Sequence, residues 1–334
     1  MRLHSYQSPL IVITGAAGFI GSCLTRYLND QGHTELVLVD DIKKTEKWKN
    51  LLHKQFIECI SKHELKEWLK TRHGEIGAII HLGACSSTME MDGDYLMKNN
   101  YRYSIDIAEY ALNHDLRFIY ASSAATYGDG SLGFSDSHEE LEELSPLNLY
   151  GFSKHSFDLW LKYQGVLDQV VGLKYFNVFG PNENHKGVMA SMVYKMIPMI
   201  EKEGLIQLFK SSDLDKFAHG DQCRDFIYVK DVVRMTASFL ENDLGGIFNI
   251  GSGQTTTWNT LAKALFKALG RPERIEYVNM PESLMKQYQN YTCADMYKFK
   301  KAYGYLPDQP ICEYTIEEAV FDYVKNHLLR DKRW

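Results

Sequence analysis

A tyrosine and a lysine stand four residues apart in the segment YGFSK at residues 150–154. The pattern that follows predicts a helix to about Tyr163, so both side chains lie on one helix face, one turn apart. A phenol with a pKa of about 10 is a poor base at neutral pH, but a nearby ammonium favours the phenolate. We therefore predict that Tyr150 transfers a proton and that Lys154 lowers its pKa. The alternative is an ordinary Tyr and Lys on an amphipathic helix.

Small and hydroxyl-bearing residues end the apolar run before that helix, in the segment YASSAATYG at residues 120–128. Ligands bind at the carboxyl ends of parallel strands, so these residues should reach the same site. Ser123 is the natural partner of a substrate hydroxyl, with Ser122 or Thr126 as neighbours. A plain loop hydroxyl is the alternative. Ala84 follows an earlier apolar run and would let a cofactor lie close, whereas His81 within that run is expected to be a core histidine.

Three glycines separate the first apolar run from the first helical pattern, in the segment TGAAGFIG at residues 14–21. Gly15, Gly18 and Gly21 permit close approach of the main chain to phosphates, and the helix N-terminus adds partial positive charge. Asp40 ends the next strand about 20 residues on, where a carboxylate meets the adenosine ribose of a dinucleotide. We predict a nicotinamide dinucleotide here; a tight turn without a ligand is the alternative.

The residues after this strand bear on the choice between NAD and NADP. Asp40 and Asp41 favour a free ribose 2′-hydroxyl, whereas cationic groups favour a 2′-phosphate. Lysines follow closely, at Lys43, Lys44, Lys47 and Lys62. Each lysine alone fits a solvated loop, but the cluster favours NADP over NAD.

Short apolar runs alternate with helical patterns through the first half of the chain. Strands are expected at residues 10–14, 35–40, 78–81, 117–122, 170–175 and 246–250. Runs that are apolar throughout indicate strands buried on both faces, and hence an α/β fold with a doubly wound parallel sheet of the Rossmann type. A second, smaller α/β substrate lobe is expected. The predicted division is 1–176 for the dinucleotide-binding domain, with a returning segment near 230–255, and 177–229 with 256–334 for the substrate lobe.

Composition narrows the class of protein. The 334 residues carry a formal net charge of -6, with no basic block typical of nucleic-acid binding. No run is long enough for a membrane span and no signal peptide is evident, so we expect a cytoplasmic protein without membrane partners. The six cysteines are scattered, which predicts reduced thiols and no metal site.

The glycine turn, Ser123, the Tyr150/Lys154 pair and the segment YFNVFGP at residues 175–181 together resemble the extended short-chain dehydrogenase/reductase family. The likeness spans nearly the whole chain. The segments GACSST at 83–88, NNY at 99–101 and NHKGVMAS at 184–191 resemble the branch that epimerises an ADP-linked heptose at C6″. The resemblance implies a nucleotide-sugar substrate, a role in lipopolysaccharide precursor synthesis, and a homo-oligomer, a ring of five subunits.

The resemblance also implies roles for individual residues. Tyr150 would be one acid/base group and Lys186 the second, although a cation that contacts phosphate is the rival role for Lys186. Substrate contacts implied are Ser123, Asn177, His185, Lys186, Phe209, Arg224 and Tyr288. Cofactor contacts implied are Gly15, Gly18, Phe19, Ile20, Gly21, Asp40, Asp41, Lys47, Lys62, Ala84, Asn99, Lys154 and Val178. The chain departs from the family pattern at Asp41, where Asn is usual, and at Asn182, where Arg is common.

Three other functions can be weighed from the residues. A dehydratase needs an acid/base pair beside Ser123, and Ala124 and Ala125 occupy those places. A UDP-hexose 4-epimerase would use the same Ser/Tyr/Lys set without a need for Lys186. A cofactor-binding redox sensor would not need that set at all.

Overall fold

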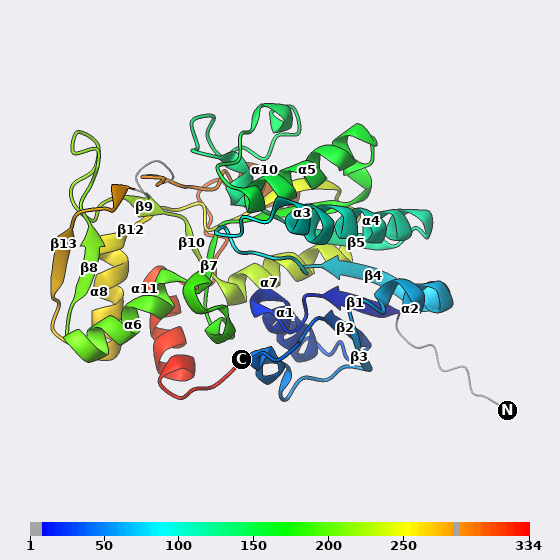
Figure 1. The fold of residues 1–334 in the computed structure, drawn as a ribbon, viewed down its shortest axis with the longest axis horizontal. Helices are drawn as coiled ribbons and strands as arrows, with labels where there is room; N and C mark the ends of the chain where they lie inside the picture. Colours follow the sequence, from blue (N-terminus) through cyan, green and yellow to red (C-terminus); the bar gives the residue numbers. More distant parts are fainter. Residues whose placement is uncertain (1–8, 283–287) are drawn as a thin grey trace.

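Seven parallel strands form the central sheet, in the order β11-β6-β5-β4-β1-β2-β3 (Figure 1). The computed structural model describes residues 9–282 and 288–334. The strands are β1 (Leu10–Thr14), β2 (Leu36–Asp40), β3 (Glu58–Ser61), β4 (Ile76–His81), β5 (Arg117–Ser123), β6 (Val171–Tyr175) and β11 (Gly246–Ile250). The predicted Rossmann-type sheet is therefore confirmed. Its inner strands are almost wholly buried because helices cover both faces.

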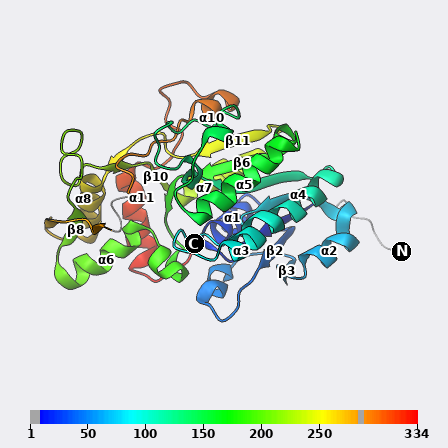
Figure 2. The same cartoon turned by 45° about the horizontal axis from the view of Figure 1, so that its top comes forward.

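Helices lie on both faces of this sheet (Figures 1 and 2). On one face α1 (Phe19–Asp30) packs against α7 (Val229–Ser238). The other face carries α2 (Leu65–Arg72), α3 (Gly93–Leu96), α4 (Tyr103–Asn113) and α5 (Leu149–Tyr163). The Tyr110 hydroxyl donates to the Leu69 carbonyl at 2.8 Å and ties α4 to α2.

Short strand pairs and three helices form a second group beside the sheet (Figure 1). β8 (Ile206–Phe209) pairs with β13 (Ile275–Val278), and β9 (Cys223–Arg224) pairs with β12 (Thr256–Thr257). The helices α6 (Met192–Glu203), α8 (Trp258–Leu269) and α11 (Ile316–Asp322) pack together, because α8 contacts both of the others. A third pair joins β7 (Asn177–Phe179) to β10 (Phe226–Tyr228), and α10 (Tyr297–Ala302) contacts β11. The division of the chain at residue 176 stays a prediction.

The described residues bear on membrane-spanning helices, metal-binding groups and cysteine pairing. No helix in the described ranges is long and apolar enough to cross a membrane. No group of three or more His, Cys, Asp or Glu side chains within 9–282 and 288–334 is placed to hold a metal ion. All six cysteines are free thiols, of which Cys23 and Cys223 are buried and Cys59 is exposed.

Candidate active site

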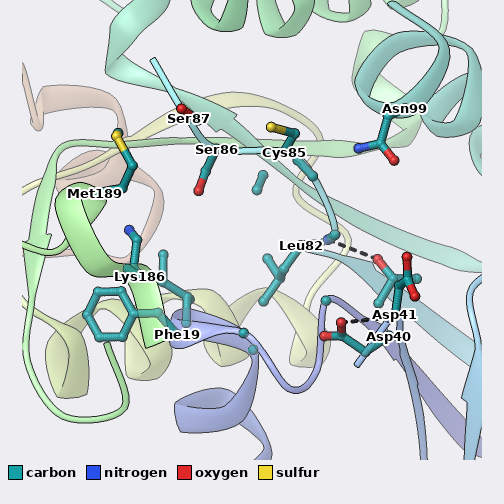
Figure 3. A pocket seen from close by; sticks show the side chains of 18 of the residues that line it. Phe19, Asp40, Asp41, Leu82, Cys85, Ser86, Ser87, Asn99, Lys186 and Met189 are labelled. Atoms are coloured by element: carbon teal, nitrogen blue, oxygen red, sulfur yellow. Dashed lines mark hydrogen bonds between the residues drawn. The ribbon is translucent and has the colours of Figure 1, made fainter. Parts of the chain in front are cut away.

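A cavity of about 600 Å³ lies at the carboxyl ends of the central strands (Figure 3). All residues that the family resemblance assigned to the cofactor line it, from the glycine turn to Val178. Of the residues assigned to catalysis or substrate, Ser123, Tyr150, Lys154, His185 and Lys186 line it too. The structure thus brings a dinucleotide-sized groove and the proposed reactive groups into one space.

The glycine turn packs so closely against neighbouring main chain that side chains would not fit at two of its positions. Gly15 has φ +68°, and a Cβ there would lie 2.7 Å from the Gly83 Cα. A Cβ on Gly21 would lie 2.2 Å from the Gly15 carbonyl oxygen. Gly18 caps α1 without a side-chain acceptor, so the helix N-terminus faces the cavity with main-chain NH groups suited to a phosphate.

The carboxylate of Asp40 is already engaged within the chain. Its Oδ2 accepts from the Ala17 NH at 2.8 Å, and its Oδ1 accepts from Lys47 Nζ at 2.7 Å. Asp41 contacts Lys43 Nζ at 3.1 Å and Lys62 Nζ at 3.9 Å. This part of the cavity lining therefore contains three ammonium groups and two carboxylates.

Tyr150 lies in the first turn of α5. The helix begins there because the Asn148 side chain accepts from the Gly151 NH at 2.8 Å. Lys154 is buried, and its Nζ donates to the Ala121 carbonyl at 2.7 Å. Burial lowers the pKa of Lys154 to about 8.

The predicted effect of Lys154 on the phenol stays a prediction. Burial raises the pKa of Tyr150, and the opposing influence is a hydrogen bond with Ser123 rather than the ammonium. The Lys154 head group is turned toward the β5 main chain. Ser123 is thus the group that opposes the effect of burial on the Tyr150 pKa.

The hydroxyls of Ser122 and Thr126, the neighbours of Ser123, form hydrogen bonds with other groups of the protein. Ser122 donates to Asp158 at 2.7 Å, and Thr126 donates to the Ser123 carbonyl at 2.8 Å. His81 is the core histidine that the sequence indicated, with Nδ1 2.6 Å from Thr14 Oγ1 and Nε2 2.9 Å from Ser104 Oγ. Of these groups, only Ser123 is among the causes that shift the pKa of Tyr150.

Lys186 enters the cavity from a short 3-10 segment at Asn184–Met189. Its Nζ lies 5.4 Å from the centre of the Phe19 ring, and Figure 3 shows it on the opposite side of the cavity from Cys85. Burial lowers its pKa, with Glu183 acting in the opposite sense. His185 contacts Asn50 at 3.2 Å, and burial lowers its pKa to about 4.

Four residues assigned to the substrate lie outside this cavity, in the second group of elements or at its border. The Arg224 guanidinium stacks 5.0 Å from the Tyr288 ring, and Phe209 meets Tyr288 edge to face at 6.3 Å. No ion pair joins Arg224 to a carboxylate within the described residues, and Asp225 instead accepts from Ser252 at 2.7 Å. Asn177 is exposed. Arg224 is thus a buried cation with aromatic neighbours.

The structure adds lining residues that sequence reasoning missed. They are Thr45, Leu82, Cys85, Ser86, Ser87, Tyr95, Tyr103 and Met189. Cys85–Ser87 follow β4, so their place at the carboxyl end of a strand was the available signal. Asn182, which departs from the family pattern, does not face the cavity: its side chain bonds Ser22 at 3.0 Å and the Trp334 main chain at 2.9 Å.

Comparison with known proteins places the chain among nucleotide-sugar enzymes. Residues 11–251 match the model of the NAD dependent epimerase/dehydratase family. The ADP-L-glycero-D-manno-heptose-6-epimerase of Nitratidesulfovibrio vulgaris is 44% identical over 324 residues, 96% of this chain and 98% of that protein. The enzyme of the same name from Fusobacterium nucleatum is 42% identical over 334 residues, 96% and 99% of the two chains.

Solved structures agree with this placement. The Helicobacter pylori ADP-L-glycero-D-manno-heptose-6-epimerase superposes with a TM-score of 0.78 at 28% identity, over 98% of this chain and 99% of that one. A Thermotoga maritima UDP-glucose 4-epimerase gives the same TM-score at 24% identity, over 97% and 100% of the chains, and shows the shared fold alone.

Proposed function

Because the chain belongs to the NAD dependent epimerase/dehydratase family, we propose that it interconverts ADP-D-glycero-D-manno-heptose and ADP-L-glycero-D-manno-heptose. The observation that carries this proposal is that Tyr150 and Lys186 enter one cavity from different elements. Epimerisation by transient oxidation needs a proton acceptor for each orientation of the reacting hydroxyl, and two such groups meet that need. Relatives at 42–44% identity over nearly the whole chain carry the name of this activity.

The reaction assigns a separate step to each residue. Tyr150, which lines the cavity together with Ser123, takes the proton from the C6″ hydroxyl of one epimer. A nicotinamide dinucleotide held by the glycine turn would accept the hydride from C6″ and give it back to the opposite face of that carbon. Lys186 donates the proton that completes the other epimer, and takes it in the reverse direction. Burial suits Lys186 to this task because it lowers the pKa of the ammonium.

We infer NADP as the cofactor, although related structures at 24% identity contain NAD. A carboxylate selects NAD by accepting from the ribose 2′-hydroxyl, but the charge of Asp40 is countered by Lys47 at 2.7 Å. Lys43, Lys47 and Lys62 line the same end of the cavity and suit a 2′-phosphate. We also propose that this chain forms a homo-oligomer, which by resemblance to the family is a pentamer.

The test is incubation of the purified protein with a panel of ADP- and UDP-linked sugars, read by NMR at the reacting carbon. Inversion at C6″ of the ADP-heptose, without reaction of UDP-hexoses, is the expected result. Inversion at C4″ of a UDP-hexose that is insensitive to Lys186→Met would instead assign the 4-epimerase reaction. A protein that binds the cofactor but converts no sugar would favour the alternative function of a cofactor-binding redox sensor.

A further inference from the structure

The segment that carries Lys186 is closed at its base by one buried side chain. We call residues 183–191 the Lys186 loop. Its tip is exposed at Gly187 and Val188, whereas Glu183 and Ala190 near its ends are buried. Main-chain bonds within the loop run from the Lys186 NH to the Glu183 carbonyl at 2.9 Å and from the Ala190 NH to the Gly187 carbonyl at 3.0 Å. A loop with an exposed tip depends on its ends for its position.

The Glu183 carboxylate joins the two ends. Its Oε1 accepts from Ser191 Oγ at 2.7 Å, and its Oε2 accepts from the Ser191 NH. Oε1 also accepts from the Tyr323 hydroxyl at 3.0 Å and from the Gly180 NH at 3.3 Å. The side chain is 0% exposed, so these donors replace water entirely. Buried carboxylates held by several donors fix their surroundings because each bond is costly to leave unmade.

A second contact holds the loop against the cofactor turn. The buried Asn50 amide donates to the Ala17 carbonyl and to the Asn182 carbonyl, each at 3.0 Å, and lies 3.2 Å from His185 Nδ1. Asn50 therefore connects the glycine turn with the start of the loop. Glu183 supplies the matching connection between the start and the end.

Charge relates Glu183 to Lys186 as well. Within the described residues no carboxylate forms an ion pair with Lys186 inside 4.0 Å, yet Glu183 opposes the effect of burial on the Lys186 pKa. The same two groups act reciprocally, since Lys186 favours the charged form of Glu183. The carboxylate thus influences both the position and the charge of the lysine.

We propose that Glu183 is a positioning residue for the reaction: it holds the Lys186 loop closed at Ser191, so that Lys186 reaches the cavity that Tyr150 also lines. This inference rests on the proposed function, in which Lys186 is the second acid/base group. It differs from that proposal in assigning an effect to a residue that contacts neither substrate nor cofactor.

The experiment follows transfer of deuterium from C6″-deuterated substrate to the bound cofactor in one turnover, separately for each epimer. Lys186→Met should suppress transfer from one epimer and spare the other, whereas Tyr150→Phe should show the opposite preference. Glu183→Gln replaces one carboxylate oxygen by an NH2 group that opposes a Ser191 donor. It should reduce transfer by about tenfold or more, from the same epimer as Lys186→Met.

A double variant separates positioning from general destabilisation. If Glu183 acts through Lys186, Glu183→Gln combined with Lys186→Met should be no slower than Lys186→Met alone, because the shared effect is counted once. Two outcomes would overturn the inference while leaving the proposed function intact. One is a Glu183→Gln variant that slows deuterium transfer equally for both epimers. The other is a double variant in which the rate losses of the two single variants multiply. Absence of any epimer preference in Lys186→Met would instead overturn the proposed function.

Two further variants guard against misfolding. Ser191→Ala removes the hydroxyl donor to Glu183 and should show the same epimer preference more weakly, even if Glu183→Gln does not fold. Tyr323→Phe removes another donor to Glu183 from outside the loop and should likewise give the same epimer preference, more weakly than Glu183→Gln. A Ser191→Ala or Tyr323→Phe variant that slows both epimers equally would count against the closure.

Discussion

At the scale of single residues, the environment of Tyr150 is set by burial and by one hydroxyl. The phenol pKa is raised by burial, and the Ser123 hydrogen bond is the opposing contribution. Lys154 donates to a main-chain carbonyl of β5 instead. The acid/base role that we propose for Tyr150 therefore includes Ser123, which opposes the effect of burial on the phenol pKa.

Replacing Tyr150 by phenylalanine removes only the hydroxyl. We expect turnover to fall by on the order of a hundredfold or more, as loss of a general acid/base group implies. Fold and cofactor binding should be nearly unchanged, because the ring remains in α5. Steady-state epimerisation and cofactor content measure the two effects, and wild-type turnover would remove Tyr150 from the mechanism.

His81 makes a prediction about acid stability. Burial, with a smaller effect of Lys154, lowers its pKa from 6.5 to about 3. Between these values the unfolded chain binds a proton that the folded chain does not, so stability falls as the pH falls. His81→Gln should remove this loss, worth about 1–2 kcal/mol at pH 5.

Urea denaturation at pH 7 and pH 5 measures this effect. The variant starts less stable at pH 7 because its hydrogen bonds to Thr14 and Ser104 change. The gap between wild type and variant should then narrow at pH 5. A gap that stays constant or widens would mean that His81 does not contribute to acid sensitivity.

At the scale of elements, one buried ion pair fixes α5 against two strands. Asp158 of α5 accepts from Tyr120 at 2.9 Å and from Ser122 at 2.7 Å, both in β5. Lys174 of β6 lies 3.5 Å from the same carboxylate, and both side chains are 0% exposed. Because Asp158 lies one turn beyond Lys154, this network sets the position of the reactive helix face.

Asp158→Ala leaves the Lys174 ammonium buried without a carboxylate. We expect the free energy of unfolding to fall by about 3–5 kcal/mol, which chemical denaturation measures. Adding Lys174→Met should recover part of that loss, since the uncompensated charge is gone. A double variant as unstable as the sum of the two single variants would show that the pair is not coupled.

At the scale of the whole molecule, the cavity joins residues from distant parts of the chain. Its walls come from the glycine turn, the strand ends, α5 and the Lys186 loop. A cofactor that is regenerated in every turnover has no need to dissociate. We therefore expect purified protein to retain NADP through gel filtration, identified by absorbance and mass.

Two lysine variants, one in the cavity wall and one outside it, test which residues retain the cofactor. Lys62→Met should reduce retention of NADP, because Lys62 lines the cavity and is held by Asn99 at 2.8 Å. Lys49→Met should not, since Lys49 pairs with Glu46 and does not line this cavity. Finding NAD in the wild-type protein would reverse the proposed cofactor.

The sequence by itself determined the elements whose signals are local. Apolar runs and glycine spacing predicted six strands of the central sheet and the turn before α1, because burial on both faces demands such runs. β3 was missed, since its alternating, half-exposed residues at the sheet edge resemble a loop. The positions at strand ends also pointed correctly to the cavity.

Only the tertiary structure decided which polar groups meet. The direction of Lys154, the burial of Ser122 and Thr126, and the separation of Arg224 from the cavity depend on packing between elements far apart in sequence. So do the bonds that join Glu183 to Ser191 and Tyr323. Hydrogen-bond partners and desolvation are properties of the folded surroundings, and residue spacing along the chain does not contain them.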